Sequence, residues 1–223
     1  LESETLYRPD GTALVRQGFN QTETSFKREH FSADGTVVVS KEDRGYGHYG
    51  LSEMYPNGKP RVDATRGIGY TYLKFYRPDG TDELQVQMWS DRSITVNNYD
   101  SAGKPYLETR WRESKSGPVD GNGYRPMVLW RVIETNDKGR PVREVDLRPD
   151  RTIEKVTVYK NFEYVNGRLE YSFNASGQAI SYKARDDNGK ELPEVILKPG
   201  SGPSFTVPDS YHVLKPFSMP EGI

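Results

Sequence analysis

The chain has no cysteine among its 223 residues, and this absence removes several classes of chemistry. It excludes disulfide bonds, thiolate catalysis and zinc or iron–sulfur sites that use cysteine ligands. The three histidines, His30, His48 and His212, form neither an H-x-x-x-H nor an H-E-x-x-H pattern, so the sequence gives no support for a zinc site. A G-x-S-x-G motif is also missing, so a hydrolase serine is not indicated. We therefore expect no metal, no cofactor and no catalytic residue.

Long apolar runs and an excess of one charge are missing as well. No stretch approaches the roughly 18 consecutive apolar residues that predict a membrane-spanning helix, so we expect no membrane span. Lysine plus arginine number 31 and aspartate plus glutamate 32, for a formal net charge of -1. Because binding to nucleic acid or anionic membranes depends on a basic excess, we expect neither as a partner.

Hydrophobic residues are scarce, but aromatic residues are not. The hydrophobic share is 34% and the mean hydropathy is -0.83, which is low for a thick globular core. The aromatic share is 12%, with 15 Tyr, 8 Phe and 3 Trp, whereas disordered chains are poor in aromatic residues. A polar, tyrosine-rich composition is typical of thin β-sheets with one or both faces wet.

A recurring turn motif dominates the sequence. Arg8-Pro9-Asp10-Gly11-Thr12 returns unchanged as Arg77-Pro78-Asp79-Gly80-Thr81, and looser copies lie between and after them. The turn glycines 11, 35, 58, 80 and 103 are separated by 24, 23, 22 and 23 residues. Proline presets the first corner of such a turn, and Asp-Gly or Asn-Gly tolerates the positive φ that tight hairpins need. A fixed period of this length predicts a repeat protein built from β-hairpins.

The segments between the turns alternate apolar and polar residues. Leu84, Val86 and Met88 alternate with glutamine and tryptophan, for example, and no segment shows the spacing of a buried helix. Turns recur about every 10–12 residues when the less regular ones are included. We predict an all-β antiparallel meander of hairpin repeats with 12–14 strands and essentially no helix. The meander could form an elongated or curled single sheet, or a closed barrel.

Two interruptions suggest the organisation of the chain. The turn spacing widens to 36 residues between Gly103 and Gly139, and prolines recur after Leu192. Proline cannot donate the hydrogen bond that a central strand requires. We expect a first hairpin array over residues 1–112, an insertion loop over 113–126, a second array over 127–192 and a proline-rich extended tail over 193–223.

The turn motifs resemble those of known repeat families. Tyr55-Pro56-Asn57-Gly58-Lys59, Tyr76 to Thr81 and Tyr99 to Pro105 are similar to the YD repeats of bacterial Rhs-type proteins, and equally to the variant MORN repeats of bacterial proteins. The resemblance covers roughly residues 6–190. It implies a β-hairpin array, which in Rhs-type proteins forms shells and surface-exposed wraps.

Glycines beside aromatic residues are the most unusual local feature. Arg44 to Gly50 and Arg66 to Tyr72 each mix glycine with tyrosine, and Gly123-Tyr124 lies in the insertion. Such segments either offer flat faces for sugar rings or prolines, or are wide loops whose tyrosines fold back on the sheet. The candidate binding residues are Tyr46, His48, Tyr49, Tyr70, Tyr72, Trp89, Trp111, Tyr124 and Trp130.

Paired carboxylates are the other candidate chemistry. Glycoside hydrolysis needs two carboxylates roughly 5–10 Å apart, and Glu144 with Asp146, or Asp79 with Asp82 and Glu83, could meet that spacing. The turn aspartates more simply shape their own turns.

Three functions remain open from the sequence. The leading hypothesis is a non-enzymatic structural or interaction module, extracytoplasmic or at the cell surface, that presents a Tyr/Trp-rich sheet to a protein or glycan partner. The alternatives are a glycan-directed enzyme with a site in the Gly-Tyr loops, and an immunity or antitoxin-type protein binder. The oligomeric state stays open.

Overall fold

The computed structural model describes residues 2–20, 25–121, 123–159, 167–186 and 188–212. Within these ranges the regular structure is β-strand apart from one short 3₁₀ turn, η1. No helix in the described ranges is long and apolar enough to cross a membrane. The strands are β1 Glu2–Tyr7, β2 Ala13–Asn20, β3 Ser25–Phe31, β4 Val37–Asp43, β5 Tyr49–Met54, β6 Pro60–Gly67, β7 Tyr70–Tyr76, β8 Asp82–Trp89, β9 Ile94–Tyr99, β10 Pro105–Glu113, β11 Met127–Thr135, β12 Pro141–Leu147, β13 Ile153–Tyr159, β14 Arg168–Phe173, β15 Ala179–Arg185 and β16 Val195–Ile196, and η1 is Asp209–His212.

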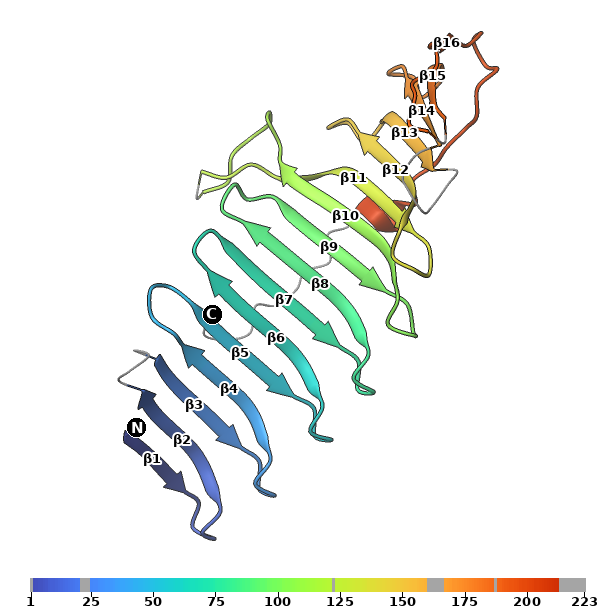
Figure 1. Cartoon of the computed structure of the whole chain (residues 1–223). Helices are drawn as coiled ribbons and strands as arrows, with labels where there is room; N and C mark the ends of the chain where they lie inside the picture. The colour runs from blue at the N-terminus through green and yellow to red at the C-terminus, as the bar shows by residue number, and fades with distance from the viewer. Residues whose placement is uncertain (1, 21–24, 122, 160–166, 187, 213–223) are drawn as a thin grey trace. The chain divides into compact units, whose positions relative to one another are not determined.

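The strands form an antiparallel meander, as predicted. Their order in the sheet is β1 to β16, which is the order of the sequence (Figure 1). The order has two ends, and the closed-barrel alternative is therefore wrong for the described strands. Sixteen strands form instead of the predicted 12–14, partly because Val195–Ile196 pairs with β15 inside the proline-rich tail. Pairing is possible there because β16 is an end strand with no proline of its own.

The recurring motif forms a four-residue turn followed by a bulge. In the first copy the Arg8 amide donates to the Thr12 carbonyl at 2.8 Å, and the Gly11 amide donates to the Arg8 carbonyl at 2.9 Å. Gly11 has a φ of 84°, which glycine adopts without steric cost. This is the hairpin connection in which a type I turn precedes a residue in the left-handed region. The same hydrogen-bond pair recurs in turns that begin at Ser32, Tyr55, Arg77, Asn136, Arg148, Asn174 and Asp186.

The chain divides by contact into two compact units. Among the described residues, the first unit comprises those between 2 and 91 together with 101–103, and the second comprises 92–100 and those between 104 and 212. Residues 113–126, expected as an insertion, connect β10 to β11, which pair directly with each other in the second unit. This connection is tied at its base because the Ser114 amide donates to the Pro126 carbonyl at 2.9 Å.

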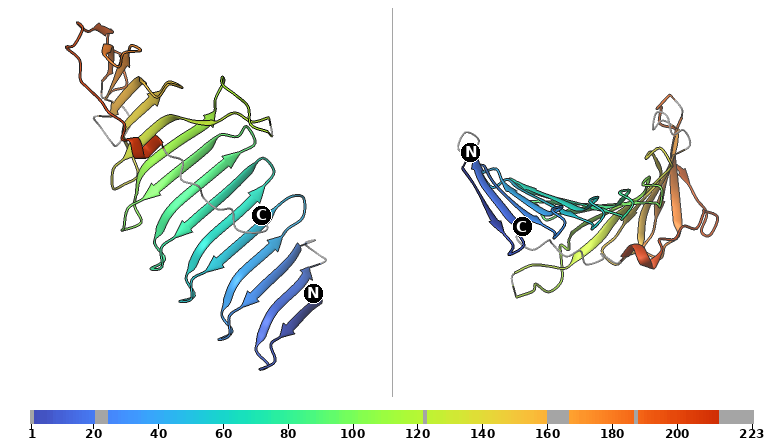
Figure 2. Two further views of the ribbon diagram at one scale, coloured as in Figure 1. Left: turned by 180° about the vertical axis from the view of Figure 1, so that it is seen from behind. Right: turned by 90° about the horizontal axis from the view of Figure 1, so that it is seen from below.

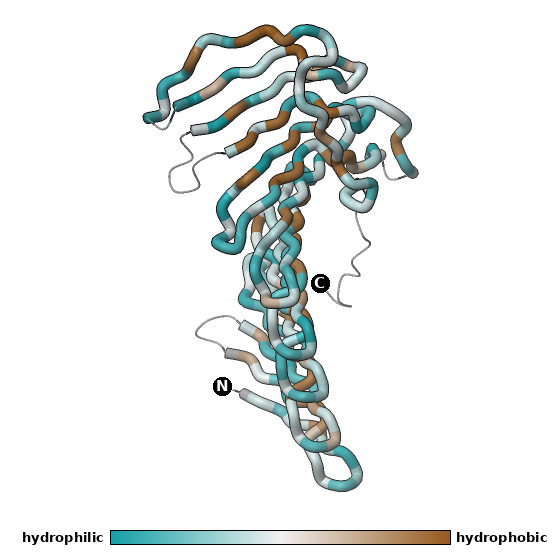
Figure 3. The backbone as a smooth tube through the Cα atoms, turned by 90° about the vertical axis from the view of Figure 1, so that its right-hand side faces the viewer, coloured by the Kyte–Doolittle hydropathy of each residue, from teal (hydrophilic) through white to brown (hydrophobic). Residues whose placement is uncertain are grey.

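One face of each unit carries the apolar core. In the first unit Ala64, Leu73 and Val86 are paired across β6, β7 and β8, and Leu73 and Val86 are fully buried. In the second unit one cross-strand row runs over Val96, Thr109, Val132, Val145, Val156, Tyr171, Tyr182 and Val195. Because side chains alternate between the two faces of a strand, the neighbouring positions form a polar face. Figure 3 shows this alternation as brown and teal segments along the strands.

The tail covers part of the apolar face of the second unit. The Phe205 ring lies 5.7 Å from that of Tyr171 and 6.0 Å from that of Phe173, measured between centroids. η1 contacts β11, and the tail and η1 are seen beside the second unit in both views of Figure 2. Burial and the nearby Glu134 charge raise the pKa of Tyr211 in η1. The tail also reaches the opposite, polar face, where Glu194 accepts a hydrogen bond from the Ser181 hydroxyl at 2.6 Å.

Candidate functional site

Tyr46 and His48 lie in the connection between β4 and β5. The loop is closed by the Arg44 amide, which donates to the His48 carbonyl at 2.9 Å. Tyr46 has a φ of 52° and is 87% exposed. Tyr49 follows in β5, paired with Asp43 and Arg66. This connection therefore presents one isolated aromatic ring at its tip.

Tyr70 and Trp89 form a ring pair on the polar face of the first unit. Gly67, Tyr70 and Trp89 occupy one cross-strand row over β6, β7 and β8. The two ring centroids are 6.5 Å apart with planes tilted by 50°, and Tyr70 and Trp89 are 37% and 48% exposed. A Cβ atom on Gly67 would lie 2.4 Å from the Tyr70 ring. Glycine is therefore needed at position 67 for the tyrosine ring to lie against the strand.

The next row on this face is uncharged and polar. Thr65, Tyr72 and Gln87 are directly paired, and Tyr72 shares the face of Tyr70 because the two are two residues apart on β7. Partial burial raises the pKa of the Tyr72 phenol, so its hydroxyl remains a hydrogen-bond donor at neutral pH. We define the aromatic face as Tyr70, Tyr72, Gln87 and Trp89.

Charges beside the aromatic face neutralise one another. Lys74 pairs with Asp82 at 3.0 Å and its ammonium lies 4.9 Å from the Tyr76 ring centroid. The Tyr76 hydroxyl donates to the Asp63 carboxylate at 2.8 Å. Burial, and then this hydrogen bond, raise the pKa of Tyr76 far above its ordinary value. The aromatic face is thus bordered by satisfied charges.

The other three candidate aromatic residues belong to the second unit and do not form one surface. Trp111 is 4% exposed, and its indole nitrogen donates to the Thr109 hydroxyl at 3.2 Å. Tyr124 lies under the Arg92 guanidinium, whose carbon is 3.5 Å from the ring centroid. Trp130 is flanked by Arg112 and Arg131 at 5.3 and 4.7 Å from its ring centroid. Trp111 is a core residue, and Tyr124 and Trp130 each stack on arginine.

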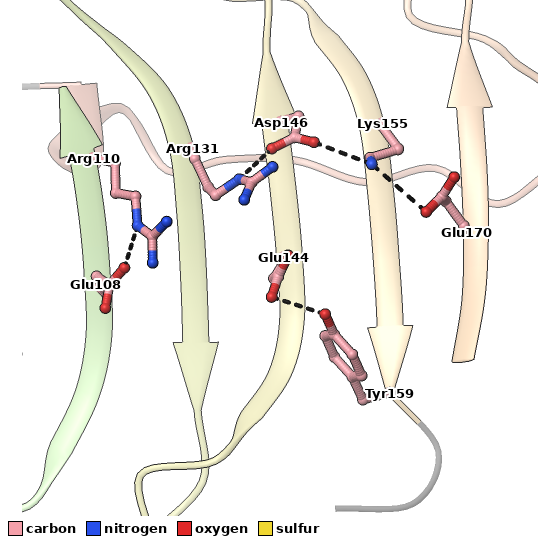
Figure 4. A network of polar contacts seen from close by, with 8 residues as sticks. All are labelled: Glu108, Arg110, Arg131, Glu144, Asp146, Lys155, Tyr159 and Glu170. Carbon is pink, nitrogen blue, oxygen red and sulfur yellow. Dashed lines mark hydrogen bonds and ion pairs between the residues drawn. The ribbon is translucent and has the colours of Figure 1, made fainter. Parts of the chain in front are cut away.

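A network of charged side chains covers the polar face of the second unit (Figure 4). One row runs through Arg110, Arg131, Asp146 and Lys155. Arg131 Nε donates to Asp146 at 2.6 Å, and Lys155 lies 3.5 Å from both Asp146 and Glu170. Although burial lowers the pKa of Arg131, the hydrogen bond and charge of Asp146 raise it overall.

The candidate carboxylate pair is occupied by this network. Glu144 accepts a hydrogen bond from the Tyr159 hydroxyl at 2.8 Å, while Asp146 is bound by Arg131 and Lys155. Burial, and then the Glu144 hydrogen bond, raise the pKa of Tyr159. Both carboxylate oxygens of Asp146 are engaged, Oδ1 by Arg131 and Oδ2 by Lys155. The arrangement is that of a cross-strand ion-pair network.

In the second candidate set, Asp79 with Asp82 and Glu83, the first two carboxylates are also engaged. Asp79 accepts hydrogen bonds from the amide and the hydroxyl of Thr81 at 2.8 and 2.7 Å, and Asp82 binds Lys74. The Thr81 hydroxyl and amide lower the pKa of Asp79. Asp79 therefore holds its own turn.

Sequence reasoning missed a third copy of the Arg-Pro-Asp-Gly-Thr motif, which differs from the other two at one position. Arg148-Pro149-Asp150-Arg151-Thr152 forms the same turn, but Arg151 replaces glycine and has a φ of 71°. A motif that leaves the glycine position free would have found it, because the flanking residues are identical.

The arginine at the start of this turn, Arg148, also links two hairpins. Arg148 Nη1 donates to the carbonyls of Ile153 and Asn174, and Nη2 donates to that of Phe173.

This link between turns recurs in the first unit. Arg8 donates to the carbonyls of Ala13, Ser32 and Phe31 in the same pattern. In another turn, Asn57 Nδ2 and Lys59 Nζ reach the carbonyls of Pro78 and Asp79 at 2.8 and 2.5 Å. The turns of successive hairpins are thereby hydrogen-bonded to each other by side chains.

Comparisons with known proteins give no family. No protein-family model matches the chain, and no curated protein matches it. Among solved structures, the crystal structure of TcdB2-TccC3-Cdc42 is similar over 90% of this chain and 15% of that chain, with 10% sequence identity and a TM-score of 0.19. This chain therefore spans about 15% of the length of its structural neighbour. A TM-score this low supports no inference about function. The hairpin-repeat architecture is observed, while membership of the YD or variant MORN families stays a prediction.

Proposed function

We propose that the chain is a non-enzymatic binding module and that the aromatic face is its binding surface. The observation that carries the proposal is the Tyr70–Trp89 ring pair, exposed side by side on adjacent strands. The turn motifs support placing the module among the bacterial hairpin-repeat proteins of YD or variant MORN type. Its partner is a protein or a glycan.

The chemistry of the aromatic face suits such a partner. Tyrosine and tryptophan are enriched at interfaces because they bury a large apolar area and retain a polar group. Strand positions hold the two rings with little freedom, so little conformational entropy is lost when a partner binds. The Tyr72 hydroxyl and the Gln87 amide lie in the next row. They can exchange hydrogen bonds with sugar hydroxyls or peptide groups.

Among the described residues, the charges that border the aromatic face are paired, and this favours an uncharged partner. Lys74, Asp82 and Asp63 are each engaged by a neighbour on the same sheet. A sugar ring or a proline ring can then stack on Trp89 without desolvating an unpaired charge. A strongly acidic or basic partner gains nothing from this face.

Alanine substitution of Trp89 tests the proposal. The full chain is screened against an immobilised glycan panel and by pull-down, and the affinity for any partner is measured by calorimetry. We expect Trp89→Ala and Tyr70→Ala to weaken binding by about 30-fold, which corresponds to a hot-spot cost of about 2 kcal/mol. Both side chains are partly exposed, so the variants should keep the fold, as circular dichroism can verify.

Tyr49→Ala provides the matched control. Tyr49 has a similar exposure of 41%, but its row contains Asp43 and Arg66 and not the Tyr70–Trp89 pair. Binding should survive this substitution. A partner whose affinity is unchanged by Trp89→Ala and Tyr70→Ala would refute the assignment of the aromatic face.

A further inference from the structure

We propose that Arg110 and Arg131, with Trp130 and Arg112 beside them, form a binding site for a single oxyanion on the polar face of the second unit. The ligand class is a carboxylate, phosphate or sulfate group. The site uses residues of β10 and β11 and is independent of the aromatic face.

Two arginines face each other in register. Arg110 and Arg131 are directly paired across β10 and β11, and like charges in such a pair repel. The next pairs in the same row, Arg131 with Asp146 and Asp146 with Lys155, are of opposite charge. The row thus alternates in sign except at Arg110 and Arg131. A bound anion between the two guanidinium groups would remove this repulsion.

Both guanidinium groups are held by their inner nitrogen atoms. Arg110 Nε donates to Glu108 at 2.5 Å, and Arg131 Nε donates to Asp146 at 2.6 Å (Figure 4). Within the described residues, neither arginine uses an Nη atom for a hydrogen bond to the protein. The two side chains are 37% and 25% exposed, so solvent reaches them. Oriented Nη groups are the donors that bind oxyanions in bidentate fashion.

A strand irregularity places an aromatic ring and a third arginine beside this pair. The register between β10 and β11 shifts after Arg110, so that Trp111 pairs with Leu129 and Trp130 has no partner opposite it. The Trp130 ring is flanked by the guanidinium groups of Arg131 and Arg112. Arg112 has no ion pair with another described residue, and its guanidinium group lies 5.3 Å from the centroid of this ring. Arg112 and Arg131 therefore flank the ring, and Arg110 faces Arg131 across the two strands. Glu108 binds Arg110, and Asp146 binds Arg131.

Side-chain NMR of the full chain tests the site. Because both Nε–H groups are hydrogen-bonded, their Hε signals should be observable and can be assigned with the variants below. The protein is titrated with sodium phosphate, sodium sulfate and sodium acetate at a fixed ionic strength set by sodium chloride. We expect the Arg110 and Arg131 Hε signals to shift in a saturable way, with half-saturation at about 1–10 mM, the range of a weak single-anion site.

Substitution of Arg110 separates this site from general charge effects. Arg110→Lys keeps the charge but loses the planar donor group, and should weaken phosphate binding at least fivefold. Arg61→Lys is the control, because Arg61 is also exposed and ion-paired, with Glu53 in the first unit; it should leave the titration unchanged. If Arg131→Gln fails to fold because it loses its contact with Asp146, the titration of Arg110→Lys still tests the proposal.

The anions also identify the source of the ligand group. Phosphate or sulfate binding tighter than acetate indicates an ester on a glycan or a modified protein, whereas comparable acetate binding indicates an acidic side chain. Shifts that stay linear in anion concentration, or that Arg110→Lys leaves unchanged, would overturn the proposal.

Discussion

Replacing Arg151 by glycine should stabilise the protein. Arg151 occupies the left-handed position of its turn at a φ of 71°, where the equivalent residue in the first copy is Gly11 at 84°. A non-glycine residue in this region costs about 1–2 kcal/mol. Glycine removes that cost, but its greater conformational freedom stabilises the unfolded chain by about 0.4–1 kcal/mol. The difference is a gain of about 0.5–1 kcal/mol.

No described contact of Arg151 offsets this gain. Its side chain is exposed and makes no hydrogen bond or ion pair within the described ranges. For a chain of 150–250 residues, 1 kcal/mol shifts the melting temperature by about 2–4 °C, so the shift should be about 1–4 °C upward. Urea unfolding followed by tryptophan fluorescence gives the free energy directly, because Trp111 is buried in the same unit.

The first copy of the turn supplies the reverse experiment. Gly11→Arg converts Arg8-Pro9-Asp10-Gly11-Thr12 into the sequence of the later turn, and a Cβ atom at Gly11 meets no other atom within 4 Å. The added side chain therefore tests the backbone conformation alone and should cost about 0.5–1 kcal/mol. A loss of stability in Arg151→Gly, or no loss in Gly11→Arg, would show that turn conformation does not set these energies.

Two further predictions follow from the same turns. Arg148→Met removes the hydrogen bonds that join two hairpins and should lower the free energy of unfolding by about 2–3 kcal/mol, as measured by urea titration. Arg8→Met should have a similar effect. Unchanged stability in both variants would contradict the linking role of these arginines. Hydrogen bonds from a hydroxyl group, and then from a backbone amide, lower the pKa values of four turn aspartates, Asp10, Asp34, Asp79 and Asp150. Their contribution to stability is therefore complete above the ordinary value of 3.8. It is lost as the pH falls through the lowered pKa values. Replacing these four aspartates, Asp10, Asp34, Asp79 and Asp150, by asparagine should reduce the fall of the urea midpoint below pH 4. An unchanged pH dependence of the urea midpoint would contradict this prediction.

Periodicity in the sequence was sufficient to predict the meander but not the exposure of each face. Trp89 and Trp111 both lie in alternating strands, yet Trp89 is half-exposed and Trp111 is buried. Alternation shows which residues share a face, whereas burial depends on what packs there. In the second unit one cover is the tail, where Phe205 contacts Tyr171 and Phe173. That contact joins residues about 30 positions apart and has no signal in the local pattern.

In the candidate sites, too, neighbours in the sequence could be predicted, whereas neighbours on different strands could not. Gly67 and Tyr70 are close in sequence, and their mixture of glycine and tyrosine pointed to the aromatic face. Trp130 also stood out as an aromatic residue, but its neighbours Arg112 and Arg131 depend on the register of β10 with β11. A one-residue shift in that register would place different side chains on the face. The oxyanion site could therefore be recognised only from the structure.

The order of the strands has a consequence for how the chain acquires its structure. Among the described strands, the order in the sheet is the order of synthesis from β1 to β16. Contacts between sequence neighbours close short loops and cost little entropy, which favours rapid folding. During translation each hairpin can add to an existing edge as soon as it leaves the ribosome, without waiting for the end of the chain. We expect growth by one repeat at a time, in the direction of synthesis.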